Sequence, residues 1–447
     1  MPATAFEFPA GLPWLNAGNP LTSAALSGRV TVLHFFACGQ IAALDPLADL
    51  SGPAERLGAR LAVTGVHCPQ FPAERDREHL RQNLFRLGYR LPVVHDRDCA
   101  VARACAITGL PALVVLGPDG SIKARAEGAG AGAELAATVE AMAAGLAEPA
   151  PLPVSLEEDV TDPGLVSFPE GLLALSAQEL YLADTGNHRL LGVNVDRPSL
   201  RGLVAVTAGG GRPGHVDGDF STARFNRPVG LCLGPDGRSL LVADAGNHCL
   251  RRVDLIDKIV ETMAGPWRTP VPAWPTDVAL VRGRPVMTLA GWGQVAELGA
   301  DGRLAVLAEG LVEPRGLAVR GDNIFMADAG AGTILRLNAV NGVSTILAGP
   351  ESLEHPQGLC LDPGGRELFI ADTYHHKIAR LDSEDRGFAV LAGKGRGSVD
   401  GMSARFFAPG AVSAAGGLVF VADTVNHHVR FVDLATGRTE TLRLELA

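Results

Sequence analysis

The side chains of this chain best suited to chemistry are its cysteine thiols, because a thiolate can exchange disulfides or reduce a peroxide. Cys38 follows a strand-like apolar run at residues 29–36, and Cys68 follows the next such run, at residues 59–67. In a parallel sheet both positions fall at the carboxyl ends of strands, where functional sites gather. Oxidoreduction by Cys38, with or without Cys68, is therefore one function to weigh.

The cysteines as a set indicate structural thiols instead. Their number, seven, is odd, and no two of them form a Cys-x-x-Cys motif. Cys99 and Cys105, six residues apart on an expected helix, do not share a face well enough to pair. In a reducing compartment such thiols mostly behave as small buried hydrophobic side chains. We therefore favour isolated thiols over a displaced pair of Cys38 and Cys68.

Two patterns divide the chain. In residues 1–146, apolar runs that predict strands alternate with helix-period segments such as residues 74–88 and the stretch from Asp98, which predicts an α/β domain. Residues 147–164 are rich in proline and acidic residues and predict a linker. The remainder, residues 165–447, is a series of repeats.

Each repeat reads Pro-x-Gly, an apolar strand, a turn, a second strand ending in Ala-Asp, and two further strands. Clear copies begin at Phe168, Arg227, Glu313, His355 and Ala408, and an eroded copy begins at Trp274. The period of roughly 40 to 60 residues is typical of propeller blades. Six such units predict an all-β, six-bladed β-propeller, since a single four-stranded sheet could not bury both of its faces.

Histidines and aspartates recur once per blade at fixed repeat positions. These residues are His188, His248, His376 and His427, and Asp184, Asp244, Asp328, Asp372 and Asp423. Their spacing scatters them around the ring, so they cannot converge on one ion. We expect them to make hydrogen bonds in turns, and we predict neither a metal site nor a cofactor.

Several motifs resemble a known family. Ala-Asp-Thr-Gly-Asn-His-Arg at residues 183–189 is similar to the NHL-repeat β-propeller. Combined with GLPWLNAGNPL (11–21), LHFF (33–36), GVHCPQFPAE (65–74) and GLPALVVLGPDG (109–120), the chain resembles the NHL repeat-containing protein 2 family. The resemblance implies a thioredoxin-like domain followed by a six-bladed NHL propeller.

The same resemblance shows a degenerate active site. It places the two cysteines of a thioredoxin-like redox pair at Gln40 and Ala43, and it implies a cis-proline at Pro111. Disulfide exchange needs one activated thiolate and a second thiol that resolves the mixed disulfide. An amide and a methyl group can supply neither.

A binding site is expected at the propeller channel. The residues between Pro and Gly of each repeat approach one mouth of the channel; they are Glu170, Val229, Thr276, Arg315, Gln357 and Gly410. Units one and four lie opposite in a ring of six, which sets Glu170 across from Arg315. We expect Glu170, Thr276, Arg315 and Gln357 to contact a peptide or a small polar partner, with solvated loop ends as the alternative.

The eroded third unit raises a separate question. It carries Ala290-Gly291 where its siblings have Ala-Asp, and Trp267, Trp274 and Trp292 cluster around it. The tryptophans mark a docking face or replace a lost turn by packing, and we favour packing. The ring has two candidate closing strands, Glu440–Leu446 and Pro153–Glu157.

The bulk composition excludes some function classes. The 447 residues carry a formal net charge of -10, and no clustered basic surface that would neutralise phosphates is evident. No basic leader with an apolar core and no apolar run of membrane-spanning length is present, so we expect no membrane partner and a cytoplasmic location. We predict a non-catalytic scaffold that binds a protein or peptide at a propeller face. The alternatives are the thiol-dependent oxidoreductase and a propeller-borne, metal-dependent lyase or hydrolase.

Overall fold

The computed structural model describes residues 6–152, 154–157, 164–268 and 271–447. The chain divides into two compact units, Met1–Thr161 with Pro270–Pro272, and Asp162–Thr269 with Ala273–Ala447. Residues 153 and 158–163 of the expected linker lie outside the described residues. Residue 153 is also the first residue of the candidate closing strand Pro153–Glu157. Within the described ranges, no helix is both long and apolar enough to cross a bilayer.

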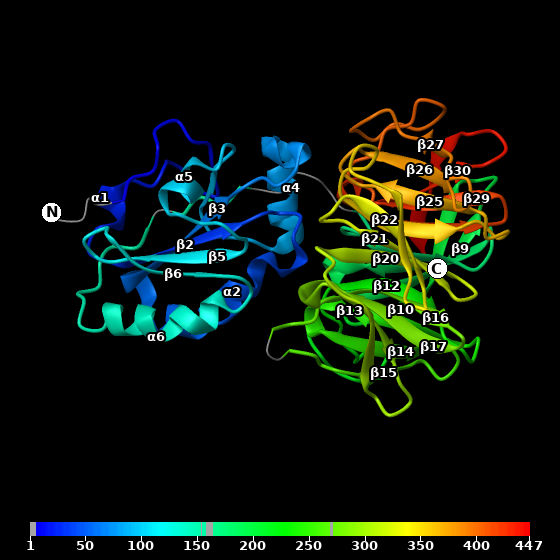
Figure 1. Ribbon diagram of the computed structural model, residues 1–447, viewed down its shortest axis with the longest axis horizontal. Coiled ribbons are helices and arrows are strands. Elements are labelled where there is room, and N and C mark those ends of the chain that lie inside the picture. The colour runs from blue at the N-terminus through cyan, green and yellow to red at the C-terminus, as the bar shows by residue number, and fades with distance from the viewer. Residues whose placement is uncertain (1–5, 153, 158–163, 269–270) are drawn as a thin grey trace. The chain divides into compact units, whose positions relative to one another are not determined.

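The first unit is an α/β domain built on a six-stranded mixed sheet (Figure 1). Every residue of the central strand β2 (Val30–Phe36) is buried, as expected for a strand covered on both faces. It pairs in parallel with β3 (Leu61–His67) and antiparallel with β5 (Ala112–Leu116). The order is β1-β4-β3-β2-β5-β6, in which the outer strands are β1 (Trp14–Leu15), β4 (Val93–His95) and β6 (Ile122–Glu127).

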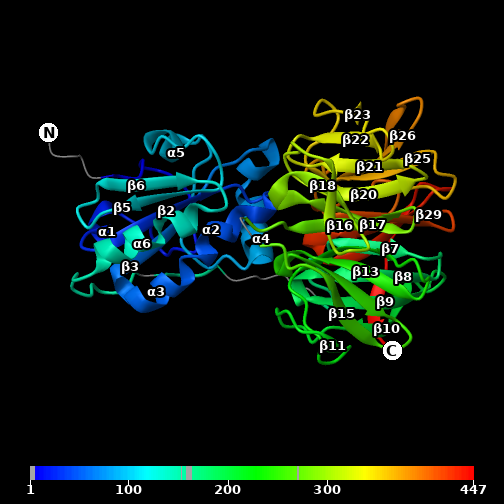
Figure 2. The ribbon, with the colours of Figure 1, turned by 60° about the horizontal axis from the view of Figure 1, so that its bottom comes forward.

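Helices cover both faces of this sheet. They are α1 (Ser23–Leu26), α2 (Asp45–Ala48), α3 (Ser51–Leu57), α4 (Arg77–Leu87), α5 (Ala100–Ala104) and α6 (Ala131–Ala143), with 3-10 turns η1 (Ile41–Leu44), η2 (Gly58–Arg60) and η3 (Pro72–Arg75). Successive residues of β2 point to opposite faces. Val32 packs with α3 and α6, which lie beside one another (Figure 2), and Phe36 packs with α4. Phe35 packs with α5 on the other face.

The helix predicted over residues 74–88 begins later than expected. Asp76 is its N-cap, and the carboxylate accepts a hydrogen bond of 2.8 Å from the backbone N–H of His79. Such a cap satisfies one of the free N–H groups of the first helical turn. Glu74 therefore lies in the preceding turn η3 and not in the helix. Its side chain reaches the loops that contain Gly39 and Gln70.

The described residues of the second unit form six antiparallel sheets around a common axis (Figures 1 and 2). The first three blades are β7–β10 (Gly171–Ala174, Glu179–Asp184, Arg189–Asp196, Arg201–Ala208), β12–β15 (Pro228–Leu233, Ser239–Asp244, Cys249–Asp254, Ile259–Ala264) and β16–β19 (Pro275–Val281, Arg284–Leu289, Gln294–Leu298, Leu304–Ala308). The last three are β20–β23 (Pro314–Arg320, Asn323–Asp328, Thr333–Asn338, Ser344–Ala348), β24–β27 (Pro356–Leu361, Glu367–Asp372, Lys377–Asp382, Phe388–Ala392) and β28–β31 (Ala411–Ala415, Leu418–Asp423, His428–Asp433, Thr439–Thr441). A short strand β11 (Gly218–Asp219) extends the second blade.

The core of the propeller lies between neighbouring blades. In β8, Leu180 and Leu182 pack toward the sixth blade, whereas Tyr181 and Ala183 pack toward the second. This alternation follows from the two-residue period of a strand. Each blade thus completes the core of its two neighbours, and the innermost strands form a closed ring in which β28 contacts β7.

The Pro-x-Gly motif permits the close approach of the innermost strands. A Cβ atom added to Gly171 would lie 1.7 Å from the carbonyl oxygen of Val229 in the next blade, and one added to Gly316 would lie 2.5 Å from that of Gln357. No side chain fits at such distances. At these two positions glycine is therefore required by the close packing of neighbouring innermost strands.

Two recurring hydrogen bonds join each of three blades to the next. The hydroxyls of Thr185, Thr373 and Thr424 donate to the carbonyl oxygens of Pro228, Pro409 and Pro169, at 2.7, 2.9 and 2.6 Å. The Nδ1 atoms of His188, His376 and His427 accept from the backbone N–H groups of Arg227, Ala408 and Phe168, at 3.0, 3.1 and 3.0 Å. We call these the junction threonines and the junction histidines. The imidazoles of these three histidines thus bond to the next blade, while their backbone N–H groups close their own turns, as predicted, by donating to the carbonyl oxygens of Thr185, Thr373 and Thr424 at 3.2 Å each. The ring of His248 lies 4.7 Å from that of Trp274.

The recurring aspartates accept backbone N–H groups, as the sequence predicts. The carboxylate of Asp184 accepts from Ser167, and that of Asp244 accepts from Asn226. Asp244 also binds the wholly buried Arg251, whose Nη1 lies 2.9 Å from Oδ2.

The sixth blade supplies its own fourth strand, as the first candidate has it, but with different bounds. The expected strand Glu440–Leu446 is split: β31 completes the sixth blade, and β32 (Arg443–Leu446) pairs in parallel with β10 at the outer edge of the first blade. The last strand thus adds a fifth strand to the sheet that contains the first strand of the ring.

Candidate functional site

The position of the missing redox pair lies just after β2. The chain leaves β2 at Phe36 and passes through Cys38 to Gln40, the residue that precedes η1. Ala43 lies within η1 and is wholly buried. The Leu110–Pro111 peptide bond is cis, as the resemblance implies. Neither Gln40 nor Ala43 offers sulfur, so the nearest thiol along the chain is that of Cys38.

Cys38 is a buried thiol held beside a carboxylate. It is 0% exposed, and its Sγ lies 3.7 Å from Oε1 of Glu74. Burial raises the pKa of the Cys38 thiol well above its usual range; the charge of Glu74 adds to this shift, while Arg86 opposes it. A thiol in this environment stays protonated, and only the thiolate is a nucleophile. Cys38 therefore lacks the activation that disulfide exchange requires.

Glu74 connects two loops from within the interior. It is 0% exposed, and its Oε1 accepts a hydrogen bond of 2.9 Å from the N–H of Gly39. Its Oε2 accepts one of 2.7 Å from the N–H of Gln70. These bonds satisfy a buried carboxylate that would otherwise be costly to desolvate, and they tie the loop after β2 to the loop after β3.

His67 completes a group of three ligating side chains. It ends β3, is 0% exposed, and its ring lies 5.4 Å from that of Phe36 and 5.1 Å from that of His95. One ligating atom each of Cys38, His67 and Glu74 lies within 4.8 Å of the other two. We call this group the Cys38–His67–Glu74 cluster. Burial lowers the pKa of His67 well below its usual range, and the nearby His95 adds to the shift, so the ring is neutral.

Sequence reasoning singled out Cys38 but missed His67 and Glu74. The signal was present in GVHCPQFPAE, where a histidine ends a buried strand and a glutamate follows a proline turn. Their approach to Cys38 depends on the helix starting at Arg77 and not at Glu74, which the helical pattern of residues 74–88 concealed. No metal-ligating group was predicted for the first unit, and the structure brings these three side chains together there.

Cys68 does not assemble with Cys38. Cys38 packs with α4 in one cluster, whereas Cys68 packs with α5 in the cluster on the opposite face of the sheet. Cys68 instead lies beside Cys99 and Asp96, and burial together with the charge of Asp96 raises the pKa of its thiol. All seven cysteines are free. The displaced redox pair is therefore not formed.

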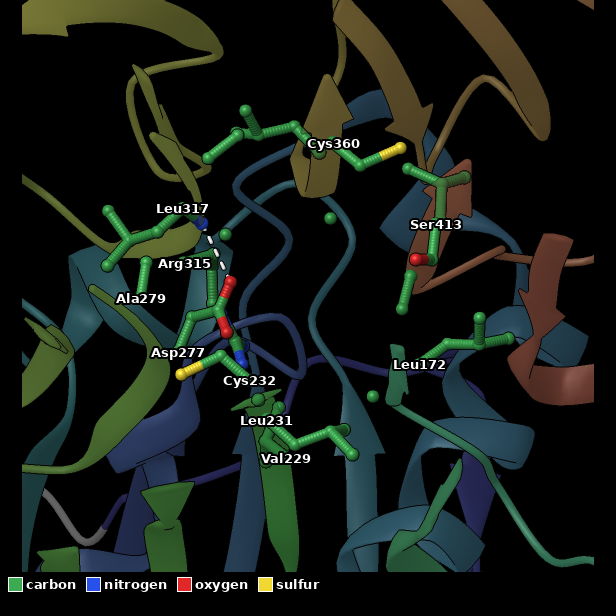
Figure 3. A pocket seen from close by; sticks show the side chains of 18 of the residues that line it. Leu172, Val229, Leu231, Cys232, Asp277, Ala279, Arg315, Leu317, Cys360 and Ser413 are labelled. Atoms are coloured by element: carbon green, nitrogen blue, oxygen red, sulfur yellow. Dashed lines mark hydrogen bonds between the residues drawn. The ribbon is translucent and has the colours of Figure 1, made fainter. Parts of the chain in front are cut away.

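The six channel positions do converge. Glu170, Val229, Thr276, Arg315, Gln357 and Gly410 all line one cavity of about 230 Å³ at the ring axis (Figure 3). They are not solvated loop ends, because Glu170 is 5% and Arg315 is 3% exposed. The guanidinium of Arg315 binds the carboxylate of Glu313 at 2.7 Å, and Nε2 of Gln357 lies 3.2 Å from Nδ1 of His355. Four of the six positions thus carry polar side chains in a largely apolar lining, and those of Arg315 and Gln357 are bonded to neighbouring residues.

Thr276 has a structural task that the sequence did not reveal. Its hydroxyl donates to the carbonyl oxygen of Pro314 in the fourth blade, at 2.8 Å. In the first, fifth and sixth blades a junction threonine after the second strand makes this bond, whereas the third blade has Ala290 there and the second and fourth also have alanine. Leu289, and not Gly291, occupies the position of the recurring aspartate, so the expected alignment of this blade was shifted by two residues.

Asp277 is the one ionisable group that the third blade adds to the channel lining, at the place where the first, second, fourth and fifth blades have glycine and the sixth has Ala411. Its Oδ2 accepts a hydrogen bond of 2.7 Å from the N–H of Leu317, drawn in Figure 3. Burial raises the pKa of Asp277 to about 7, although the N–H groups of Leu317 and Val278 oppose the shift. The carboxyl group therefore titrates near neutral pH.

The tryptophans around the third blade pack internally. Trp267 and Trp292 pack against the core cluster that joins the second and third blades. Trp274 is 8% exposed and contacts His248 edge to face. This burial supports packing over a docking face.

Comparison with known proteins agrees with this architecture. A family model of the NHL repeat matches residues 225–252, which include the first strands of the second blade. NHL repeat-containing protein 2 of Bos taurus is 28% identical, with the alignment covering 96% of this chain and 70% of that protein. The chain is a homologue of NHL repeat-containing protein 2.

Two further relatives are similar to nearly all or to part of this chain. Protein SUPPRESSOR OF QUENCHING 1, chloroplastic, of Arabidopsis thaliana is 29% identical over 98% of this chain, which spans about half (48%) of that protein. Thioredoxin-like protein SkfH of Bacillus subtilis is 27% identical over 26% of this chain and 80% of its own length. The fold is a thioredoxin-like α/β unit followed by a six-bladed NHL propeller.

Proposed function

We propose that this chain is a non-catalytic scaffold that binds a protein or peptide through its propeller. The observation that carries the proposal is the chemistry at the redox position: Gln40 and Ala43 hold no sulfur, and Cys38 is a wholly buried thiol beside a carboxylate. A unit built this way recognises partners without exchanging disulfides. The free state of all seven cysteines supports a reducing compartment, the cytoplasm.

The partner is expected at the channel mouth. A cavity of about 230 Å³ is smaller than a typical pocket for a drug-sized ligand. It can hold a single polar side chain or a chain end, so the rest of a bound peptide would lie across the surrounding loops. Gln357 and the Glu313–Arg315 ion pair supply the polar groups that would orient such an end.

The oxidoreductase alternative is tested with insulin-disulfide and hydroperoxide turnover by the wild type and Cys38→Ser. We expect the turnover of both proteins to equal the background rate in both assays. Turnover that depends on Cys38 would overturn the non-catalytic proposal, and turnover that depends on Cys68 would point to the opposite face of the sheet. The lyase or hydrolase alternative has no support in residues 164–268 and 271–447, where no group of three metal-ligating side chains meets.

The binding proposal is tested by cross-linking partners to the full-length chain in cells and quantifying them by mass spectrometry. The amount of a cross-linked partner that binds at the channel should fall by about tenfold or more for Gln357→Ala. A tenfold weaker affinity corresponds to a loss of about 1.4 kcal/mol in binding free energy. Arg303→Ala is the matched control, because Arg303 is 89% exposed and does not line the channel. Partners that are equally retained by both variants would place binding elsewhere.

A further inference from the structure

The Cys38–His67–Glu74 cluster brings together three different ligating groups from three separate segments. Cys38 follows β2, His67 ends β3 and Glu74 lies in η3. All three side chains are 0% exposed. A thiol, an imidazole and a carboxylate meeting in the interior have no common task in packing, whereas sulfur, nitrogen and oxygen donors together make a metal site.

We propose that Cys38, His67 and Glu74 bind one zinc ion. In a tetrahedral zinc site, Zn–S and Zn–O bonds of ordinary length set the sulfur and oxygen ligands about 3.6 Å apart. The Sγ of Cys38 and Oε1 of Glu74 are 3.7 Å apart, and a ring nitrogen of His67 lies within 4.8 Å of the Cys38 sulfur and of a carboxylate oxygen of Glu74. The three ligands need only small side-chain movements to reach bonding distance. Three protein ligands leave a fourth position at the metal.

His67 gives independent support for a ligand. Neither of its ring nitrogens has a hydrogen-bond partner among the described protein atoms, although the ring is wholly buried. His34 is equally buried one strand away, yet its Nδ1 lies 3.0 Å from the Tyr89 hydroxyl and its Nε2 lies 2.8 Å from the Ala43 carbonyl oxygen. Buried polar atoms are normally satisfied. His67 departs from that rule at the place where a metal would satisfy it.

Charge and donor type favour zinc over calcium and magnesium. A Cys38 thiolate and a Glu74 carboxylate carry two negative charges, so a divalent cation with a neutral His67 gives a neutral buried site. Calcium and magnesium prefer oxygen ligands and would not take the thiolate. On binding, the S–H bond of Cys38 breaks, a Zn–S bond forms and the proton passes to solvent, with no change of oxidation state.

The test uses the full-length chain, stripped of metal and then titrated with Co²⁺ as a spectroscopic probe and with Zn²⁺. We expect one metal ion per chain, a sulfur-to-cobalt charge-transfer band, and displacement of cobalt by zinc. Cys38→Ser should abolish the band. Cys38→Ser and His67→Gln should each weaken zinc binding by more than about 100-fold, beyond the usual effect of losing an outer-shell partner. Cys68→Ser is the matched control, since it removes a buried thiol on the other face, and it should leave band and affinity unchanged.

Circular dichroism of the metal-free variants shows whether each one folds. X-ray absorption of the zinc-loaded wild type gives an answer that needs no variant: one sulfur ligand at about 2.3 Å with nitrogen and oxygen ligands at about 2.0 to 2.2 Å. Absence of a stoichiometric zinc ion, a zinc site without sulfur, or full binding by folded Cys38→Ser would each overturn the proposal. These outcomes are independent of partner binding at the propeller.

Discussion

The Sγ of Cys38 lies 3.7 Å from Oε1 of Glu74, and neither side chain is exposed to solvent. In a redox-active unit, a low thiol pKa keeps the sulfur ionised. Here burial and the adjacent carboxylate act in the opposite direction and raise the pKa of Cys38. The unit keeps the sheet of a thioredoxin-like domain, while burial beside Glu74 keeps the Cys38 thiol protonated.

Thiol labelling provides the first prediction. In the native protein, Cys99 should react with a disulfide reagent such as DTNB at least about 100-fold faster than Cys38, because Cys99 is partly exposed whereas Cys38 is not. Mass spectrometry after timed labelling identifies each modified cysteine. Labelling in urea is the control, since unfolding should make the two rates similar. A native Cys38 that reacts as fast as Cys99 would contradict the buried environment.

A second prediction concerns Asp277 and pH. Its pKa is raised to about 7 in the folded protein, so between about pH 4 and pH 7 the folded state holds a proton that the unfolded state releases. The free energy of unfolding of the wild type, relative to Asp277→Asn, should therefore fall as pH rises through this window. It should be flat above about pH 7. The total change is at most about 4 kcal/mol, since one pKa unit corresponds to about 1.4 kcal/mol.

Urea unfolding followed by tryptophan fluorescence measures this effect, because Trp267, Trp274 and Trp292, three of the four tryptophans, lie in the propeller. Asp301→Asn serves as the control, because the Asp301 side chain is 64% exposed. The difference between wild type and Asp301→Asn should not vary over the same range. A rise in the Asp277 difference with pH would show that the sign is wrong.

A third prediction concerns the buried arginine of the sixth blade. Arg430 is 0% exposed and binds Asp423 at 2.9 Å and Asp400 at 2.7 Å. Arg430→Met should destabilise the propeller by about 3 to 5 kcal/mol, because Asp423 would be left buried without its partner. Arg303→Met removes an exposed ion pair to Asp301 and should cost at most about 1 kcal/mol. Equal effects in urea unfolding would contradict a buried network.

Much of the fold could be predicted from the sequence because the same residue pattern recurs in each repeat. The alternation of apolar residues and the Pro-x-Gly motif predicted four-stranded blades, and counting them predicted the ring. The alignment of the third blade was predicted wrongly because this blade lacks the recurring aspartate. In the third blade Leu289 replaces the aspartate and Thr276 takes over the junction bond, so the surviving Ala290-Gly291 suggested a false alignment.

The candidate site was harder to predict because it is made by contacts across the sheet. Cys38 and Cys68 both follow parallel strands, and only the side-chain direction at each position shows that they face opposite ways. The approach of Glu74 to Cys38 depends on a helix cap at Asp76. Ring closure by β32 likewise joins residues about 240 positions apart in a pairing that no local pattern encodes.

The fourth prediction compares the junction between the sixth and first blades, which we call the seam, with a junction between blades that are consecutive in the chain. Thr424 joins the sixth blade to the first, and Thr185 joins the first to the second, by the same hydroxyl-to-carbonyl bond. Thr424→Val and Thr185→Val should each lower the free energy of unfolding by about 1 to 3 kcal/mol, since each leaves a buried carbonyl oxygen unsatisfied. The two losses should agree within about 1 kcal/mol. A much larger loss for Thr424→Val would mark the seam as a special joint.

The junction histidines carry this equivalence further. His427 reaches Phe168 across 259 positions with the geometry that His188 uses to reach Arg227 across 39. By these bonds the junction between the sixth and first blades is equivalent to an internal one, and β32 on the first blade is the feature that marks it. A circularly permuted propeller, opened in the loop between two other blades and joined across the original seam, would keep the same neighbouring blades. It should therefore fold into the same six-bladed ring.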